Sequence, residues 1–184
     1  FEDIRTRRQA RLAALTPVTD DVLRDPPAAD WPMWRRTLDS LGYSPLLQVD
    51  RSNVDRLTLG WSLSLAPGTN GIAPLVHDGV MFLNASGKVM ALDAANGDLL
   101  WEYAGQAVPG APVPISQPRG IALYEGLVYV PTMEGHILAL DARTGKIVWD
   151  QRLFETSDGL QLTAAPLVVH GKVIQGVAGA SGGE

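Results

Sequence analysis

The chain has 184 residues, of which 46% are hydrophobic and 19% are charged, a composition typical of a globular protein with a sizeable core. The formal net charge of −5 argues against binding to a nucleic-acid backbone or an anionic membrane surface. There is no cysteine, which excludes disulfides, thiolate metal sites and a cysteine nucleophile.

The first part of the chain is predicted to be a helical and irregular strap, residues 1–57, that packs on the remainder of the chain. Residues 4–15 (IRTRRQARLAAL) have helical propensity and spacing, and their basic run is expected to be a solvated helix face. Residues 19–31 (TDDVLRDPPAADW) offer Thr or Asp caps and then a Pro-Pro stop. Residues 44–61 are expected to lead into a strand. No run of about 18 apolar residues predicts a membrane span.

Two nearly identical stretches, 48 positions apart (139 − 91), indicate a repeated unit. ALDAANGDLLW occupies Ala91 to Trp101, and ALDARTGKIVW occupies Ala139 to Trp149. The complete units cover residues 74–103 and 121–151, and a third, incomplete unit covers residues 166–184. Self-similarity at a period of about 40 to 50 residues is typical of propellers and repeat arrays.

Each unit is predicted to fold as one four-stranded antiparallel sheet. Short runs rich in β-branched and aromatic residues, bounded by Gly or Asp, indicate strands rather than helices. These runs lie at residues 80–83, 127–130 and 172–174. Tight hairpins that need a positive φ are predicted at Asp78-Gly79, Glu125-Gly126 and His170-Gly171. Second turns are predicted at residues 93–97 and 141–145, where an Asp can bond nearby amides and a Gly takes the left-handed position.

One tryptophan recurs after the second turn of each unit, at Trp101 and Trp149. A large aromatic residue that appears once per sheet is interpreted as an anchor packed between adjacent sheets. Trp61 lies 40 residues before Trp101 (101 − 61) and is interpreted as the same anchor in an earlier, atypical sheet. The sequence therefore predicts an all-β protein, a partial β-propeller of about three four-stranded blades over residues 58–184.

The segment DWPMWRRTLDSLGYSPLLQVDRSNVDRLTLGWSLSLAPGTNG, followed by APLVHDGVMFL and the two ALDA repeats, resembles the N-terminal part of the pyrroloquinoline quinone (PQQ)-dependent, or quinoprotein, alcohol dehydrogenases. The resemblance covers nearly the whole chain from about Asp30. It implies an eight-bladed propeller with the quinone over the central channel and a calcium or lanthanide ion beside it. It also implies a periplasmic enzyme that oxidises alcohols or aldehydes and passes electrons to a cytochrome.

The same resemblance assigns candidate cofactor contacts. Arg119, in RGIALYEGLVYV, matches an arginine that contacts the quinone, and a guanidinium offers a planar fork of donors to carboxylate and quinone oxygens. Thr163, in LTAAPLVV, matches a threonine that bonds a quinone carboxylate. The alternatives are a surface arginine that precedes a strand and an ordinary strand threonine.

The closing SGGE resembles a segment whose backbone amides, here those of Ser181, Gly182 and Gly183, cradle the cofactor, while the glutamate, Glu184, binds the metal. A hard cation prefers oxygen ligands, which suits that role. The spacing is longer than the family pattern, and a gapless match would instead place Ser181 in the metal position.

Two departures weaken the match to the family. Gly71 stands where the family usually has a glutamate that contacts the quinone, and the vicinal disulfide of well-known members is missing. The catalytic aspartate of the family is expected beyond residue 184, so no catalytic residue is assigned. A metal site made of His77, His136 and His170 is not expected, because these residues are spread over different blade turns.

Two main functions stay open, beside the alternative of a sensor or an unrelated propeller. The first is the N-terminal portion of a PQQ- and metal-dependent dehydrogenase that is inactive by itself. The second is a cofactor-free propeller that serves as a binding or assembly scaffold, which the glycine at position 71 motivates. Three blades do not close an eight-bladed propeller, so we expect the remainder, in the same or another chain, to cover the exposed strand edge. Because the chain starts with Phe1 rather than Met, a further piece upstream is also expected.

Overall fold

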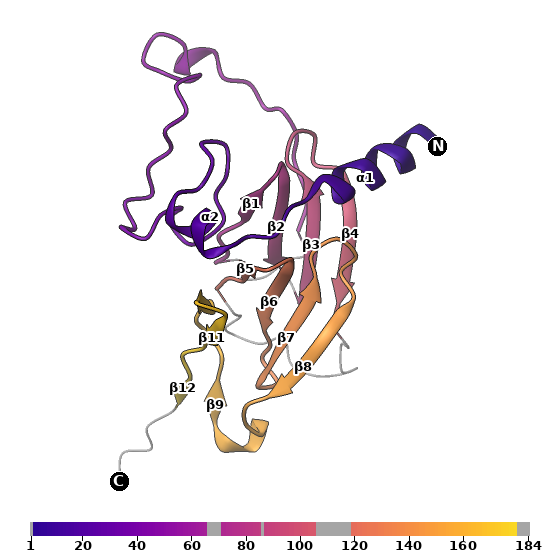
Figure 1. Ribbon diagram of the computed structural model, residues 1–184, viewed down its shortest axis with the longest axis vertical. Coiled ribbons are helices and arrows are strands. Elements are labelled where there is room, and N and C mark those ends of the chain that lie inside the picture. Colours follow the sequence, from indigo (N-terminus) through magenta and orange to yellow (C-terminus); the bar gives the residue numbers. More distant parts are fainter. Residues whose placement is uncertain (1, 66–70, 86, 106–118, 180–184) are drawn as a thin grey trace.

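The computed structural model describes residues 2–65, 71–85, 87–105 and 119–179. Two four-stranded antiparallel sheets pack against each other, the strap crosses them, and part of a third sheet lies beyond the second (Figure 1). The predicted repeat of four-stranded sheets is confirmed for the first two units. We call the sheets the first, second and third blades.

The first blade has the strand order β1-β2-β3-β4. Its strands are β1 (Leu75–His77), β2 (Val80–Ala85), β3 (Lys88–Asp93) and β4 (Leu99–Ala104). The hairpin between β1 and β2 has a loop of two residues, Asp78 and Gly79, with φ angles of 49° and 72°. Left-handed backbone at both loop positions is the hairpin geometry expected from the sequence.

The second blade repeats the first. Its strands are β5 (Ala122–Tyr124), β6 (Leu127–Pro131), β7 (His136–Asp141) and β8 (Ile147–Arg152). Ala91 pairs with Trp101 in the first blade, and Ala139 pairs with Trp149 in the second, and a register shift comes after both pairs. The repeat in the sequence is therefore a repeat of strand register.

The third blade is described only in part. A hairpin joins β10 (Leu167–Val169) to β11 (Lys172–Ile174), and β9 (Leu160–Gln161) pairs with β12 (Ala178–Gly179). A short 3-10 helix, η2 (Thr156–Asp158), precedes them.

The tryptophan anchors dock on the second turn of the following blade. The indole nitrogen of Trp101 donates to the carbonyl of Ala142 at 2.8 Å, and the ring covers Gly145 so closely that a Cβ there would lie 2.5 Å from it. Trp61 makes the equivalent contacts with the carbonyl of Ala94 at 3.2 Å and with Gly97. These contacts agree with the interpretation of Trp61 as an anchor, and they show why the turn requires glycine.

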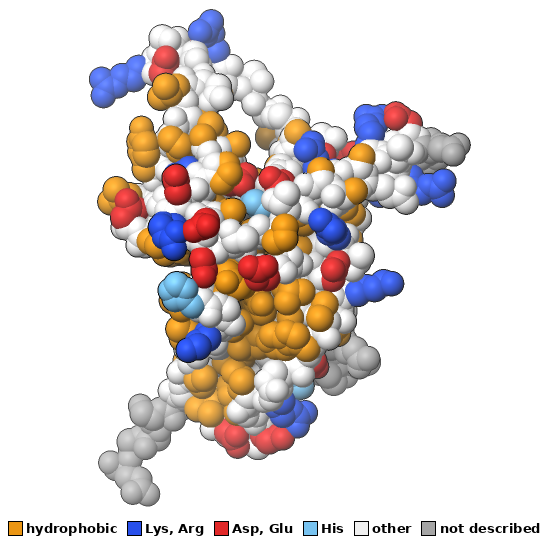
Figure 2. Space-filling view, in the orientation of Figure 1, with side chains coloured by type: hydrophobic (Ala, Val, Ile, Leu, Met, Phe, Trp, Pro, Cys, Tyr) orange, Lys and Arg blue, Asp and Glu red, His pale blue; other side chains and the backbone are white. Residues whose placement is uncertain are grey.

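The main core lies between the first two blades and includes Phe82, Trp101 and Val128. The rings of Phe82 and Trp101 are 6.0 Å apart, at a tilted angle that aromatic pairs favour. Hydrophobic side chains also gather at the surface over the second blade (Figure 2). In β8, Ile147 and Val148 are about half exposed, at 48% and 56%. An apolar surface of this kind is typical of a face that packs against another element.

The strap contains α1 (Glu2–Ala14), α2 (Asp20–Arg24) and the 3-10 helix η1 (Val54–Arg56). The hydroxyl of Thr19 caps α2 by accepting from the Val22 amide at 3.3 Å, as the sequence predicted. The strand into which residues 44–61 were expected to lead does not form at residues 57–65, where no strand of the described residues pairs with the chain. No helix in the described ranges is long and apolar enough to cross a bilayer.

Candidate functional site

Two candidate cofactor residues meet where the second and third blades begin. The backbone N–H of Arg119 donates to the carbonyl oxygen of Thr163 at 3.0 Å. The next residue, Gly120, is buried, and a Cβ on it would lie 3.0 Å from the Cβ of Ala165. The two segments approach this closely because residue 120 has no side chain. The fold thus brings together two residues that are 44 positions apart (163 − 119).

The side chains of this pair suit an anionic, oxygen-rich ligand. Arg119 is exposed and Thr163 is half-buried. Neither the guanidinium nor the hydroxyl forms a hydrogen bond with a residue in the described ranges. A free donor fork beside a hydroxyl is the donor set that a carboxylate or a quinone oxygen would bind.

A third residue at this place, Gln175, was missed by the sequence analysis. Its side-chain amide donates to the carbonyl of Ala164 at 3.0 Å and to that of Gly176 at 2.9 Å. Its Oε1 atom is buried and has no hydrogen-bond partner among the described residues. Because buried polar atoms are normally paired, this acceptor is open to a donor from a ligand or from another part of the protein. The only signal in the sequence is one polar residue at the end of the apolar run KVIQ.

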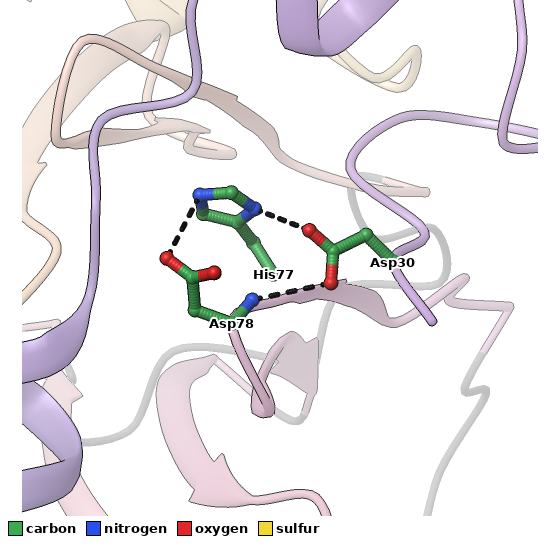
Figure 3. Close-up of side chains that lie close together, drawn as sticks. All are labelled: Asp30, His77 and Asp78. Atoms are coloured by element: carbon green, nitrogen blue, oxygen red, sulfur yellow. Dashed lines mark hydrogen bonds and ion pairs between the residues drawn. The ribbon is translucent and has the colours of Figure 1, made fainter. Parts of the chain in front are cut away.

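A second cluster joins the strap to the first blade (Figure 3). The buried ring of His77 lies between two carboxylates, with Nδ1 2.7 Å from Asp30 Oδ2 and Nε2 3.3 Å from Asp78 Oδ2. The Nε2 atom also lies 3.1 Å from both the hydroxyl and the carbonyl oxygen of Thr16. The Asp78 amide donates to Asp30 Oδ1 at 3.3 Å.

This cluster consists of metal-ligating residue types, but its ligand atoms are already engaged in hydrogen bonds with one another. Asp78 Oδ2 accepts from the amide and the hydroxyl of Thr16 at 2.8 and 2.6 Å. Although burial acts to raise the pKa of Asp78, these two bonds and the nearby His77 outweigh it and hold the pKa below its ordinary value of 3.8. We therefore describe the cluster as a clasp that holds the strap on the first blade.

The other two histidines lie elsewhere. His136 Nδ1 is 2.6 Å from Asp150 Oδ1 in the second blade. His170 Nδ1 is 3.1 Å from Asp20 Oδ2, which links the third blade to α2. No two of the three histidines share an aspartate among the described residues, and only His77 lies between two aspartates.

Comparison with known proteins decides the family. The model of the glucose/ethanol/alcohol dehydrogenase β-propeller domain, designated PQQ, matches residues 31–181. The chain belongs to this family. It is 40% identical over 182 residues to the quinohemoprotein alcohol dehydrogenase of Comamonas testosteroni, with 93% of this chain and 25% of the relative covered. It is 38% identical over 181 residues to quinohemoprotein alcohol dehydrogenase ADH IIB of Pseudomonas putida, with 94% and 26% covered.

The fold comparison agrees with the family. The structure of a europium-containing methanol dehydrogenase superposes with a TM-score of 0.76 and 32% identity, over 87% of this chain and 30% of that one. The family and the propeller fold expected from the sequence are confirmed. The chain spans about a quarter of the length of the curated relatives it matches.

Two further parts of the expected cofactor site remain. Gly71, which the resemblance aligns with a glutamate of the family, is exposed, and a Cβ there would meet no atom within 4 Å. The backbone at Gly71 therefore has room for a larger residue. The candidate cradle and metal ligand, Ser181, Gly182, Gly183 and Glu184, lie outside the described residues.

Proposed function

We propose that this chain forms part of the cofactor-binding wall of a PQQ- and metal-dependent alcohol dehydrogenase. The observation that carries the proposal is the backbone contact that brings Arg119 and Thr163 together. Family membership supports it, since the quinohemoprotein relatives are alcohol dehydrogenases. In the proposed division into a strap (residues 1–57) and a partial propeller (residues 58–184), every candidate cofactor residue belongs to the propeller.

Each residue has a binding role in this proposal. The Arg119 guanidinium binds and neutralises a carboxylate or quinone oxygen, and the Thr163 hydroxyl donates to a carboxylate. The backbone amides of Ser181, Gly182 and Gly183 cradle the cofactor, and Glu184 binds the calcium or lanthanide ion. When bound, PQQ supplies a two-electron acceptor for the oxidation of an alcohol or aldehyde. This chain fixes the orientation of that acceptor, while the catalytic base lies beyond residue 184.

Localisation and partners derive from the same proposal. We place the enzyme in the periplasm, with a cytochrome-type protein or domain as its electron acceptor. The word quinohemoprotein in the names of two relatives supports a haem acceptor.

A titration of the full-length protein with PQQ tests the proposal, first with calcium and then with europium, monitored by quinone absorbance and by dye reduction with simple alcohols. Saturable, metal-dependent binding with turnover is expected. No binding with either ion would contradict the proposal and would support the cofactor-free scaffold, which the glycine at position 71 favours.

A further inference from the structure

The strap binds the same backbone group in three successive blades. Each blade begins with a two-residue hairpin whose first loop residue has a φ of 48° or 49°, namely Asp78, Glu125 and His170. In a hairpin of this type, the amide of that residue has no partner inside the hairpin. Strap oxygens accept all three amides, and the acceptors are Asp30 Oδ1 at 3.3 Å, the Val18 carbonyl at 2.9 Å and Asp20 Oδ1 at 3.3 Å.

The contacts keep the order of the blades. Alternate strap residues 16, 18 and 20 meet the first, second and third hairpins in turn. Residues 16 and 18 lie between α1 and α2, and residue 20 is the first residue of α2 (Figure 1). Two residues of extended chain advance by about 6.6 Å, less than the separation of about 10 Å between stacked sheets. These hairpins belong to the first strand of each blade, and the blades of a propeller converge toward its central channel. Neighbouring blades are closer than about 10 Å at their inner strands, so an advance of about 6.6 Å per two strap residues suits the distance from one hairpin to the next.

Side chains fasten the same segment at both ends. Arg143, in the second turn of the second blade, donates to the carbonyl of Leu15 at 2.6 Å. Arg11 pairs with Asp93, in the second turn of the first blade, at 2.9 Å. At the far end, Asp20 also contacts the imidazole of His170 at 3.1 Å. The strap thus makes at least two contacts with each of the three blades.

We propose that residues 16–20 are a template that fixes the angle between the second and third blades and so positions Arg119 against Thr163. Arg119 lies six residues before Glu125 (125 − 119), and Thr163 lies seven residues before His170 (170 − 163). The strap therefore holds one end of each inner strand, and the candidate cofactor residues stand at the other end. Asp20 is a positioning residue in this scheme, and the scheme rests on the proposed function.

The variant Asp20→Ala in the full-length protein tests the template, because it removes both bonds to His170. Asp21→Ala is the matched control. Asp21 is also in the first turn of α2, but among the described residues its side chain pairs only with Arg24 and is 88% exposed. Asp20→Asn keeps an acceptor for the His170 amide. Hydrogen exchange, read by mass spectrometry, reports the Arg119 amide bonded to Thr163, and PQQ titration reports the site.

In Asp20→Ala we expect exchange at Arg119 and in the β10–β11 hairpin to rise by roughly five- to tenfold, the effect of one net hydrogen bond. The Kd for PQQ should rise by a similar factor, Asp21→Ala should match the wild type, and Asp20→Asn should restore most of both signals. Unchanged exchange at Arg119 relative to the control would overturn the template. Faster exchange with an unchanged Kd would overturn the positioning role. If the wild type binds no PQQ, the proposed function fails, and exchange alone then judges the template.

Discussion

Replacing Gly145 with alanine should break the contact between the first two blades. Gly145 has a φ of 68°, and a Cβ there would lie 2.5 Å from the Trp101 ring. The left-handed backbone costs a residue with a Cβ about 1 to 2 kcal/mol. Overpacking against the ring adds about 1 to 3 kcal/mol, because the indole is held by its bond to Ala142. The free energy of unfolding should therefore fall by about 2 to 5 kcal/mol.

Gly126→Ala separates the two causes. Gly126 has a φ of 77°, but a Cβ there would meet no atom within 4 Å. It should lose only the backbone part, about 1 to 2 kcal/mol. Urea unfolding of both variants of the full-length protein, monitored by tryptophan fluorescence, gives the difference. If Gly145→Ala is no less stable than Gly126→Ala, the ring does not hold the blades together in the way described.

Three further predictions concern the cofactor site and the clasp. Arg119→Ala should raise the Kd for PQQ at least about tenfold, as expected for the loss of a hydrogen bond to a charged group. The control Arg51→Ala, at an exposed strap position, should not change the Kd. Equal effects of the two variants in a PQQ titration would refute the assignment of Arg119. Gly71→Glu should change the free energy of unfolding by less than about 0.5 kcal/mol, because the position is open, and should lower the Kd for PQQ about fivefold through one added polar contact. An unchanged Kd would mean that the position does not face the quinone, and a higher Kd would contradict the added contact. The depressed pKa of Asp78 contributes stability that is present above its ordinary value of 3.8 and is lost as the pH falls through its folded value. In urea unfolding, the free energy of unfolding should therefore be lower at pH 3 than at pH 5, and Asp78→Asn should reduce that difference. An identical difference in the variant would contradict this.

The blades could be predicted from the sequence because their signals are local. Glycine after an acidic residue or histidine marks each hairpin, and an Asp followed by a Gly four positions later marks each second turn. In the structure, Asp141 Oδ1 accepts from the amides of Arg143 and Thr144 at 3.1 and 2.8 Å, which is the bonding expected of that turn. The tryptophan anchors were also evident, because one ring per repeat needs one docking place per repeat.

The contacts of the strap could not be predicted in the same way. The strap binds backbone amides of the hairpins, and a backbone amide has no signature in the sequence. Asp30, His77 and Thr16 meet only because the chain returns to the first blade from two separate places in the strap. The candidate site came from family resemblance, which named Arg119 and Thr163 as candidates. Gln175 was missed because one polar residue just after a strand usually faces solvent.

The docking of Trp101 has a consequence for synthesis on the ribosome. The ring belongs to one blade, but the glycine that receives it, Gly145, is translated 44 residues later (145 − 101). At about 5 to 20 residues per second, the first blade exists for about 2 to 9 seconds with its indole uncovered. Each new blade closes the previous one and exposes its own ring, as Trp149 is still 37% exposed at the end of the second blade. A chaperone that binds aromatic side chains has that interval, once per blade, in which to protect the nascent chain.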